Sequence, residues 1–239
     1  MRMRLLLLII TAITIVSCND ARKSETYRLL EDVDSYIEAR PDSALAVLEG
    51  IDVEDLGSRE EKAKYALLMS MALDKNYIDR TDFEVLQPAI DYYEDHGTAT
   101  DKLRTFYYQG RIYYNRGEAE EAMECLIKSI DLGSESNDLK TKARNYTVQG
   151  TLYYLYYNWD KIIESGLAAA DCYKALEDWD NYVVILCRIS EGYSMKGDKE
   201  QANEYLSKCQ DLLDKINSNS KAYYYSGYLL NGVNNVSEE

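Results

Sequence analysis

The chain has 239 residues, of which 46% are hydrophobic and 29% are charged, and its formal net charge is −15. This apolar fraction is ample for a packed core, and a content of only 2 prolines and 12 glycines favours helices over strands. The charge argues against nucleic-acid binding, because phosphates are bound by clustered Lys and Arg and the 27 basic residues form no stripe.

The N-terminus has the pattern of an export signal. Arg2 and Arg4 precede an apolar run of 12 residues, 5–16, whereas a membrane-spanning helix needs about 20. The run ends in Ile-Val-Ser-Cys, which resembles the lipobox of bacterial lipoproteins. This resemblance implies that residues 1–17 are removed and that Cys18 is lipid-modified. The alternative is an ordinary cysteine near a conventional cleavage site.

The resemblance also implies where the protein resides. Acyl chains on Cys18 would hold an exported protein in the cell envelope, and the outer membrane is the expected location. The residues that follow, Asn-Asp-Ala-Arg-Lys, are not strongly acidic, so the periplasmic and the surface face both stay open.

Periodicity and helix-breaking residues predict helices along the rest of the chain. Residues 18–24 are expected to form the lipidated tether, 25–232 a single helical domain, and 233–239 a frayed tail. Pro41 suits the first turn of a helix, and Gly50 suits the end of one. The expected helices span 25–39, 41–49, 59–75, 81–95, 99–115, 118–132, 137–156, 159–175, 178–196, 198–215 and 219–232.

A repeat with a period of 40 residues runs through the sequence. Small residues recur at this interval in a predicted first helix: Gly110, Gly150 and Ser190. The same shift superposes three tyrosines: Tyr113, Tyr153 and Tyr193. In the second helix it superposes Leu126, Gly166 and Leu206, so the middle copy is the degenerate one. A small residue in one helix of an antiparallel pair allows the two helices to approach closely.

This pattern resembles the tetratricopeptide repeat (TPR) family, through Phe106, Gly110, Tyr113, Gly117, Ala122 and Leu126. The resemblance covers about residues 25–232 and implies an all-α fold, an antiparallel helix-pair solenoid of about five helix pairs plus a terminal helix. Three features depart from the family. The period is 40 rather than about 34, Gln109 replaces the Leu before the glycine, and the helix-ending proline is absent.

Residues for catalysis or metal binding are scarce. His96 is the single histidine, so no histidine-based triad or zinc cluster can be assembled. The acidic runs are most simply solvated helix faces, and no glycine-rich phosphate motif is present. We therefore expect no enzyme activity, no cofactor and no metal.

The family resemblance implies a binding face instead. The first helix of each pair lines the concave surface in this family, and Tyr and Arg often anchor interfaces. The candidate ligand-groove residues are Arg104, Tyr107, Arg111, Tyr114, Arg144, Thr151, Tyr154, Glu191 and Met195. The Lys and Asn positions with which some chaperone-binding relatives hold a C-terminal carboxylate are not matched.

Two further expectations concern the second half of the chain. In an oxidising compartment, Cys172 and Cys187 are candidates for a disulfide, because a turn near Trp179 would bring their helices level. The terminal helix offers apolar residues beyond what one neighbour can cover, and such an end needs a polar cap or a partner. The self-association candidates are Tyr224, Tyr228, Leu229 and Leu230.

Two functions remain open from these patterns. The first is a membrane-anchored protein–protein interaction module of the cell envelope, acting as a scaffold or sensor and binding a peptide or protein. The second is a glycan-binding lipoprotein of a sugar-capture system, because exposed Tyr pairs suit sugar rings. Trp usually leads such sugar platforms, and only Trp159 and Trp179 are present.

Overall fold

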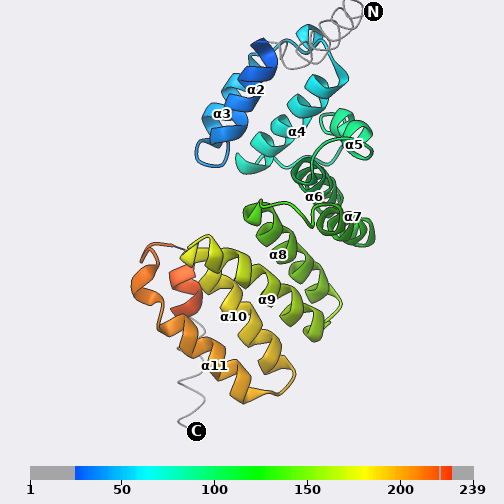
Figure 1. Cartoon of the computed structure of the whole chain (residues 1–239). Helices are drawn as coiled ribbons and strands as arrows, with labels where there is room; N and C mark the ends of the chain where they lie inside the picture. Colours follow the sequence, from blue (N-terminus) through cyan, green and yellow to red (C-terminus); the bar gives the residue numbers. More distant parts are fainter. Residues whose placement is uncertain (1–24, 221, 228–239) are drawn as a thin grey trace, which may run out of the picture. The chain divides into compact units, whose positions relative to one another are not determined.

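The computed structural model describes residues 25–220 and 222–227, and every regular element in these residues is helical (Figure 1). The helices belong to two compact units, residues 1–92 and 93–239. The all-α prediction is confirmed. The expected signal peptide 1–17, Cys18 with its tether 18–24, and the tail 233–239 lie outside the described residues.

The first unit contains four α-helices in its described residues, and α5 runs up to its boundary. Ser58 begins α4 with a capping box, in which its hydroxyl accepts from Glu61 N while the Glu61 carboxylate accepts from Ser58 N. The Asn76 side chain, just after α4, donates to the carbonyl of Pro41 at 2.9 Å and so fastens α4 to α3. The helices are α2 (Glu25–Tyr36), α3 (Pro41–Glu49), α4 (Arg59–Lys75) and α5 (Gln87–Tyr93), with a 3-10 turn at Val53–Asp55.

The helix predicted for 81–95 is shorter than expected. Asp82 binds Arg80 through both carboxylate oxygens at 2.8 Å and also accepts from Glu84 N, which holds this segment in a turn. The helix α5 starts only at Gln87, where the next residue, Pro88, suits a first turn because it has no N–H to donate.

The second unit contains six α-helices that pack consecutively, and the described residues 222–227 form a further short helix. In Figure 1 α8, α9, α10 and α11 lie side by side in chain order. The helices are α6 (Ala99–Arg116), α7 (Ala119–Leu132), α8 (Leu139–Leu155), α9 (Trp159–Ala175), α10 (Trp179–Met195) and α11 (Lys199–Gln210), followed by a 3-10 turn at Leu213–Lys215.

The helix starts follow the predicted period. The first helices α6, α8 and α10 begin at residues 99, 139 and 179, and the second helices α7, α9 and α11 begin at 119, 159 and 199. A side chain just before the helix accepts a backbone N–H three residues on at Asp138, Asn158, Asp178 and Asp198. The same start signal therefore recurs every 20 residues through these four helices.

Close packing explains the small residues of the repeat. A Cβ on Gly110 would lie 3.0 Å from Leu126 Cγ and 3.2 Å from the Ala122 carbonyl oxygen of α7. At the equivalent position two repeats along, the Ser190 hydroxyl donates to the Ala202 carbonyl at 2.8 Å. The helices therefore approach closely at both positions, and at Ser190 a hydrogen bond joins them.

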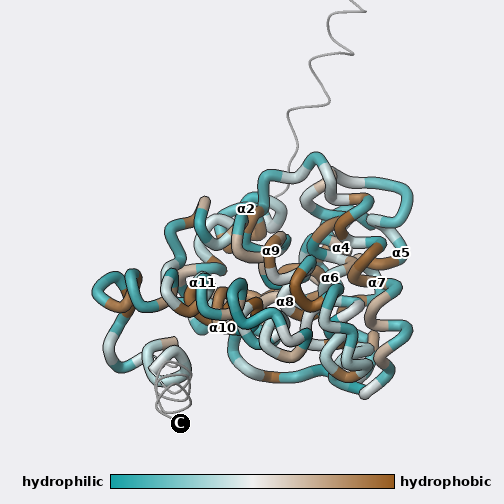
Figure 2. The backbone as a smooth tube through the Cα atoms, turned by 90° about the horizontal axis from the view of Figure 1, so that it is seen from below, coloured by the Kyte–Doolittle hydropathy of each residue, from teal (hydrophilic) through white to brown (hydrophobic). Residues whose placement is uncertain are grey.

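The core of the second unit is continuous through α8 to α11 and the terminal helix. One cluster joins buried apolar residues of α9 and α10 to Cys209 of α11, Ile216 and Ala222. Tyr193 is half-buried and stacks on Tyr205 with ring centroids 5.6 Å apart. Figure 2 shows apolar residues concentrated within the helices and hydrophilic residues in the turns that join them.

Cysteine pairing differs from the expectation. The predicted disulfide between Cys172 and Cys187 is not formed in this structure. Cys187 Sγ instead lies 3.5 Å from Cys209 Sγ of α11. Cys172 instead lies near Lys142 and Tyr146 of α8, and the Lys142 charge partly offsets the rise that burial causes in the pKa of its thiol. The two residues are carried on antiparallel neighbouring helices, but they face different partners.

Candidate functional site

The candidate groove residues of α6 are mostly engaged within the fold. Arg104 Nε donates to Asp138 Oδ2 at 2.6 Å, and this largely buried ion pair joins α6 to the start of α8. Burial raises the pKa of Asp138, but the Arg104 charge and the hydrogen bonds from Thr141 outweigh it, so this pKa lies below its ordinary value. Tyr107 is only 3% exposed, so it belongs to the core and not to an open groove.

The other candidates that do not line a pocket show varied settings. The Arg111 guanidinium lies 5.4 Å from the centre of the Tyr114 ring, a cation–π contact on a half-buried part of α6. Arg144 is half-buried and close enough to the Tyr173 hydroxyl to lower its pKa, which burial raises. Met195 is 60% exposed at the end of α10. None of these residues lines the pocket described next.

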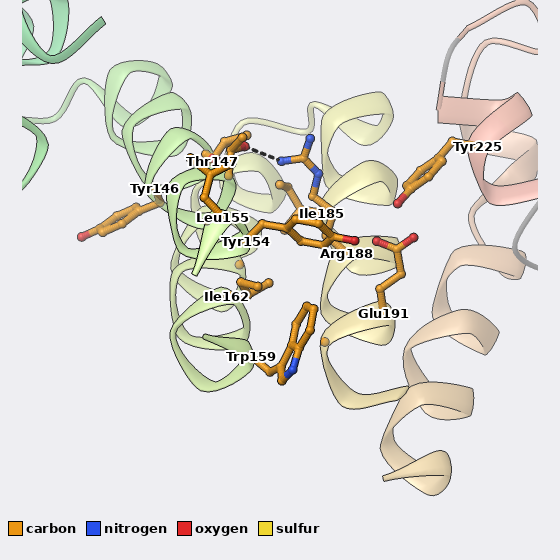
Figure 3. Close-up of a pocket in the computed structure, with 14 residues that line it drawn as sticks. Tyr146, Thr147, Tyr154, Leu155, Trp159, Ile162, Ile185, Arg188, Glu191 and Tyr225 are labelled. Carbon is orange, nitrogen blue, oxygen red and sulfur yellow. Dashed lines mark hydrogen bonds between the residues drawn. The ribbon is translucent and has the colours of Figure 1, made fainter. Parts of the chain in front are cut away.

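A pocket of about 360 Å³ lies among α8, α9, α10 and the terminal helix (Figure 3). Three of the expected groove residues line it: Thr151, Tyr154 and Glu191. These three residues come from the first helices α8 and α10, whereas the candidates on α6 do not line the pocket. We refer to this site as the α8–α10 pocket.

Small and apolar side chains from three helices form much of the α8–α10 pocket. Gly150, Gly166 and Gly192 contribute no side chain, and this leaves the space that Ile162 and Ile185 line. The glycines of α9 and α10 also allow these helices to approach, since a Cβ on Gly166 would meet Ile189 Cγ1 at 2.8 Å. The pocket therefore lies where the helices carry glycines, which leave space that side chains would otherwise fill.

A guanidinium provides the positive charge of the pocket. Arg188 of α10 is half-buried, and its Nη1 donates to the Thr151 hydroxyl at 3.1 Å, the dashed contact in Figure 3. Among the described residues no carboxylate forms an ion pair with Arg188. Since an arginine has five N–H donors, this side chain has donors left for a ligand.

A tyrosine and a glutamate face each other where the terminal helix borders the pocket. In Figure 3 the Tyr225 hydroxyl of the terminal helix points toward the carboxylate of Glu191. Burial and the nearby Glu191 carboxylate raise the pKa of Tyr225 far above its ordinary value. Tyr225 therefore stays protonated where it faces Glu191.

Aromatic side chains form the open rim. Tyr154 is 53% exposed and meets Trp159 edge to face, with ring centroids 5.6 Å apart. Tyr157, 70% exposed, also meets this indole edge to face, with ring centroids 5.8 Å apart. Leu155 extends this exposed apolar surface. Exposed apolar patches that adjoin a pocket are typical of binding sites.

Sequence reasoning missed the residues that give the pocket its chemistry. Arg188 has Tyr108 and Val148 at its equivalent positions, so the repeat offered no polar signal there. Tyr225 comes from the terminal helix, which was expected to be an end face and not a wall of the site. Trp159 enters the sequence analysis only as one of the two tryptophans of the chain.

Other kinds of site are not found in the part of the chain that the structure describes. Across residues 25–220 and 222–227, no group of three or more His, Cys, Asp or Glu side chains is placed to hold a metal ion. In the same residues no helix is both long enough and apolar enough to cross a membrane.

Comparison with known proteins identifies the fold. No family model matches the chain, and no curated protein matches its sequence. The structure resembles the nearly identical TPR-like repeats of a kinesin light chain from Podosopora anserina, with a TM-score of 0.54 and 14% identity over 81% of this chain and 98% of that one. The fold is therefore of the TPR-like, helical-repeat type.

Two structures of MamA AMB-1 are also similar, with lower TM-scores. Each has a TM-score of 0.49, and they are 19% and 18% identical over 77% and 78% of this chain. The aligned regions cover 95% and 98% of the two MamA chains.

Proposed function

We propose that this protein is a non-enzymatic binding module that holds a segment of a partner protein in the α8–α10 pocket. One observation carries the proposal: an exposed aromatic rim adjoins a largely apolar pocket, and the arginine in this pocket forms no ion pair among the described residues. The TPR-like fold supports it, because stacked helix pairs create extended concave binding surfaces.

The chemistry of the pocket defines the segment. The Ile162 and Ile185 side chains and the Tyr154–Trp159 rim suit an aliphatic or aromatic side chain, and Arg188 suits a carboxylate or another strong acceptor next to it. We infer that the preferred ligand is a peptide segment in which an apolar residue stands beside an Asp or Glu. A long acidic tract is disfavoured, because the net charge of the protein is −15.

Peptide selection tests this proposal. A random peptide library displayed on phage is selected against the protein, and the peptides obtained should pair an apolar residue with an acidic one. Trp159→Ala and Arg188→Gln should each weaken their binding about tenfold or more, in line with the loss of an interface anchor. Circular dichroism spectra of both variants are compared with that of the unaltered protein to check that they are folded.

Tyr156→Ala is the matched control, because Tyr156 is 60% exposed beside the rim and does not line the pocket. Its binding should equal that of the unaltered protein. Failure to select any peptide, or selected peptides that bind both pocket variants normally, would reject the proposal.

Glycan binding remains the second candidate function. The edge-to-face pair Tyr154 and Trp159 at the rim favours it, since exposed aromatic rings can stack on sugars. Binding on a glycan array that is lost in Trp159→Ala but retained in Arg188→Gln would support a sugar ligand in place of a peptide.

The proposed location follows from the N-terminal sequence. We propose that Cys18 carries lipid and tethers the module to the bacterial cell envelope, at the outer membrane. The segment 19–24, Asn-Asp-Ala-Arg-Lys-Ser, is polar and joins this cysteine to α2. Binding at the α8–α10 pocket would then recruit a partner to the membrane surface.

A further inference from the structure

Two cysteines of neighbouring helices meet inside the second unit. Cys187 of α10 and Cys209 of α11 are both fully buried, and their sulfur atoms are 3.5 Å apart. Cys209 Sγ also lies 3.8 Å from the carbonyl oxygen of Val183, one turn before Cys187 on the same helix. Contact of α10 with α11 along this line therefore holds the two sulfurs next to each other.

The remaining described cysteines have different surroundings. Cys125 lies half-buried on α7, and burial raises the pKa of its thiol to about 11. Cys172 is half-buried on α9 beside Lys142 of α8. Within residues 25–220 and 222–227, Cys187 and Cys209 are the only cysteines whose sulfur atoms contact each other.

We propose that Cys187 and Cys209 form a disulfide that fastens α11 to α10. A small shift closes the bond, because the sulfurs need to move from 3.5 Å to about 2.05 Å. The oxidant is a disulfide, either of a small thiol or of a protein dithiol. One cysteine thiolate attacks it to form a mixed disulfide, and the second thiolate then displaces the remaining thiol. Two protons and two electrons leave the cysteine pair, and the oxidant is released as two thiols.

Burial determines when this reaction takes place. Thiolates are the reacting species, and two side chains with no exposed surface neither ionise readily nor admit an oxidant. The mutual hydrogen bond and burial both raise the pKa of Cys187. The bond therefore closes while the chain folds, before α11 covers α10, and the folded dithiol oxidises slowly. An exported chain folds where disulfides persist.

The disulfide would also stabilise one wall of the binding site. Cys187, Cys209, Ile216 and Ala222 belong to one buried cluster, and Tyr225 packs against it. Fastening α11 to α10 thus restricts the segment that carries Tyr225 over the α8–α10 pocket. This consequence rests on the proposed function, whereas the bond itself does not.

A chain with a single possible pair tests the bond directly. Cys18, Cys125 and Cys172 are replaced by serine in the full chain, which is unfolded, reduced and refolded in a buffer of reduced and oxidised glutathione. Mass spectrometry of the digested protein should show one intramolecular link between the peptides that contain Cys187 and Cys209. A chain that refolds to the native circular dichroism spectrum with both thiols free, or with stable glutathione adducts, would overturn the proposal.

Thermal unfolding gives the second measurement. Closing the loop of residues 187–209 should raise the melting temperature by on the order of 5–10 °C, and dithiothreitol should abolish the increase. The matched control carries Cys209→Ser in addition and should show no response to dithiothreitol. If oxidised and reduced proteins melt at the same temperature, the bond does not fasten the two helices. Neither measurement involves peptide binding, so failure of the disulfide is distinguishable from failure of the proposed function.

Discussion

At the scale of single residues, two glycines determine how closely α9 and α10 approach. A Cβ on Gly166 would lie 2.8 Å from Ile189 Cγ1, and one on Gly192 would lie 2.9 Å from Ile163 Cγ1. Gly166→Ala should therefore lower the free energy of unfolding by about 1–3 kcal/mol, the usual cost of overpacking a core. Urea denaturation measures this change.

Gly227→Ala is the control for that substitution. A Cβ there meets nothing within 4 Å, so its effect should stay within about 0.5 kcal/mol. Equal stability of Gly166→Ala and the unaltered protein would show that the helices can separate without cost.

The ion pair of Asp138 with Arg104 makes stability depend on pH. The pKa of Asp138 is lower in the folded chain than in the unfolded one, so its contribution is present above about pH 4 and is lost as the pH falls below that value. Asp138→Asn retains a capping side chain but loses the charge. It should cost about 1–3 kcal/mol of unfolding free energy at pH 7, and the difference from the unaltered protein should shrink toward pH 3.

Asp178→Asn is the matched control, since Asp178 caps α10 at the equivalent position of the next repeat. It should change stability little, at either pH. A difference between Asp138→Asn and the unaltered protein that is constant from pH 7 to pH 3 would contradict the assignment.

At the scale of elements, four turns between helices of the second unit share a backbone conformation. The residue before the capping residue has positive φ at Gly117, Tyr157, Glu177 and Gly197, with values of 79°, 52°, 54° and 83°. Side chains at positive φ are strained and glycine is not. Glu177→Gly should therefore stabilise the protein by about 0.5–1 kcal/mol in urea denaturation. Lys174→Gly, in the last turn of α9, should instead destabilise it by about 1 kcal/mol. Destabilisation by Glu177→Gly would show that the glutamate side chain contributes more than the strain costs.

The helices could be predicted from the sequence because their period and their start signals are local. The ranges 59–75 and 159–175 coincide with α4 and α9, each of which begins after a polar capping residue. The range 81–95 failed because the contacts of Asp82 hold a turn that hydrophobic periodicity does not register. Local sequence patterns therefore identify a helix more reliably than they identify a preceding turn that moves its first residue along the chain.

The site could be predicted only in part, for a different reason. Thr151 and Glu191 follow from the register of the first helices, which repeats along the chain. Arg188 lies on α10 at a position where the other copies are not charged, and Tyr225 reaches the pocket through the packing of a segment beyond the clear repeats. The polar residues of the pocket therefore lie at positions where the repeats differ in sequence, and a search for periodic residues does not find such positions.

At the scale of the whole molecule, lipid attachment would determine where the pocket acts. Metabolic labelling with a fatty acid should mark the unaltered protein and should not mark Cys18→Ala, because the cysteine thiol is the proposed acceptor. Cys125→Ala is the control and should be labelled normally. Equal labelling of Cys18→Ala and the unaltered protein would contradict the tether, and the binding proposal would be unaffected.

The terminal helix leads to a prediction about assembly. Tyr224 is 66% exposed on the described helix 222–227, while its neighbour Ala222 is buried in the cluster that covers α10 and α11. Tyr228, Leu229 and Leu230, the other expected contact residues, lie outside the described residues.

An exposed aromatic at the end of a helical array favours contact with a second copy. Residues 18–239 with Cys18→Ala, and hence without lipid, should associate in light scattering as concentration rises, and Tyr224→Asp should weaken that association. Tyr77→Asp is the control, because Tyr77 is 93% exposed in the first unit and the substitution introduces the same charge. A protein that stays monomeric at every concentration, or one that Tyr77→Asp disrupts equally, would show that this helix is an ordinary cap.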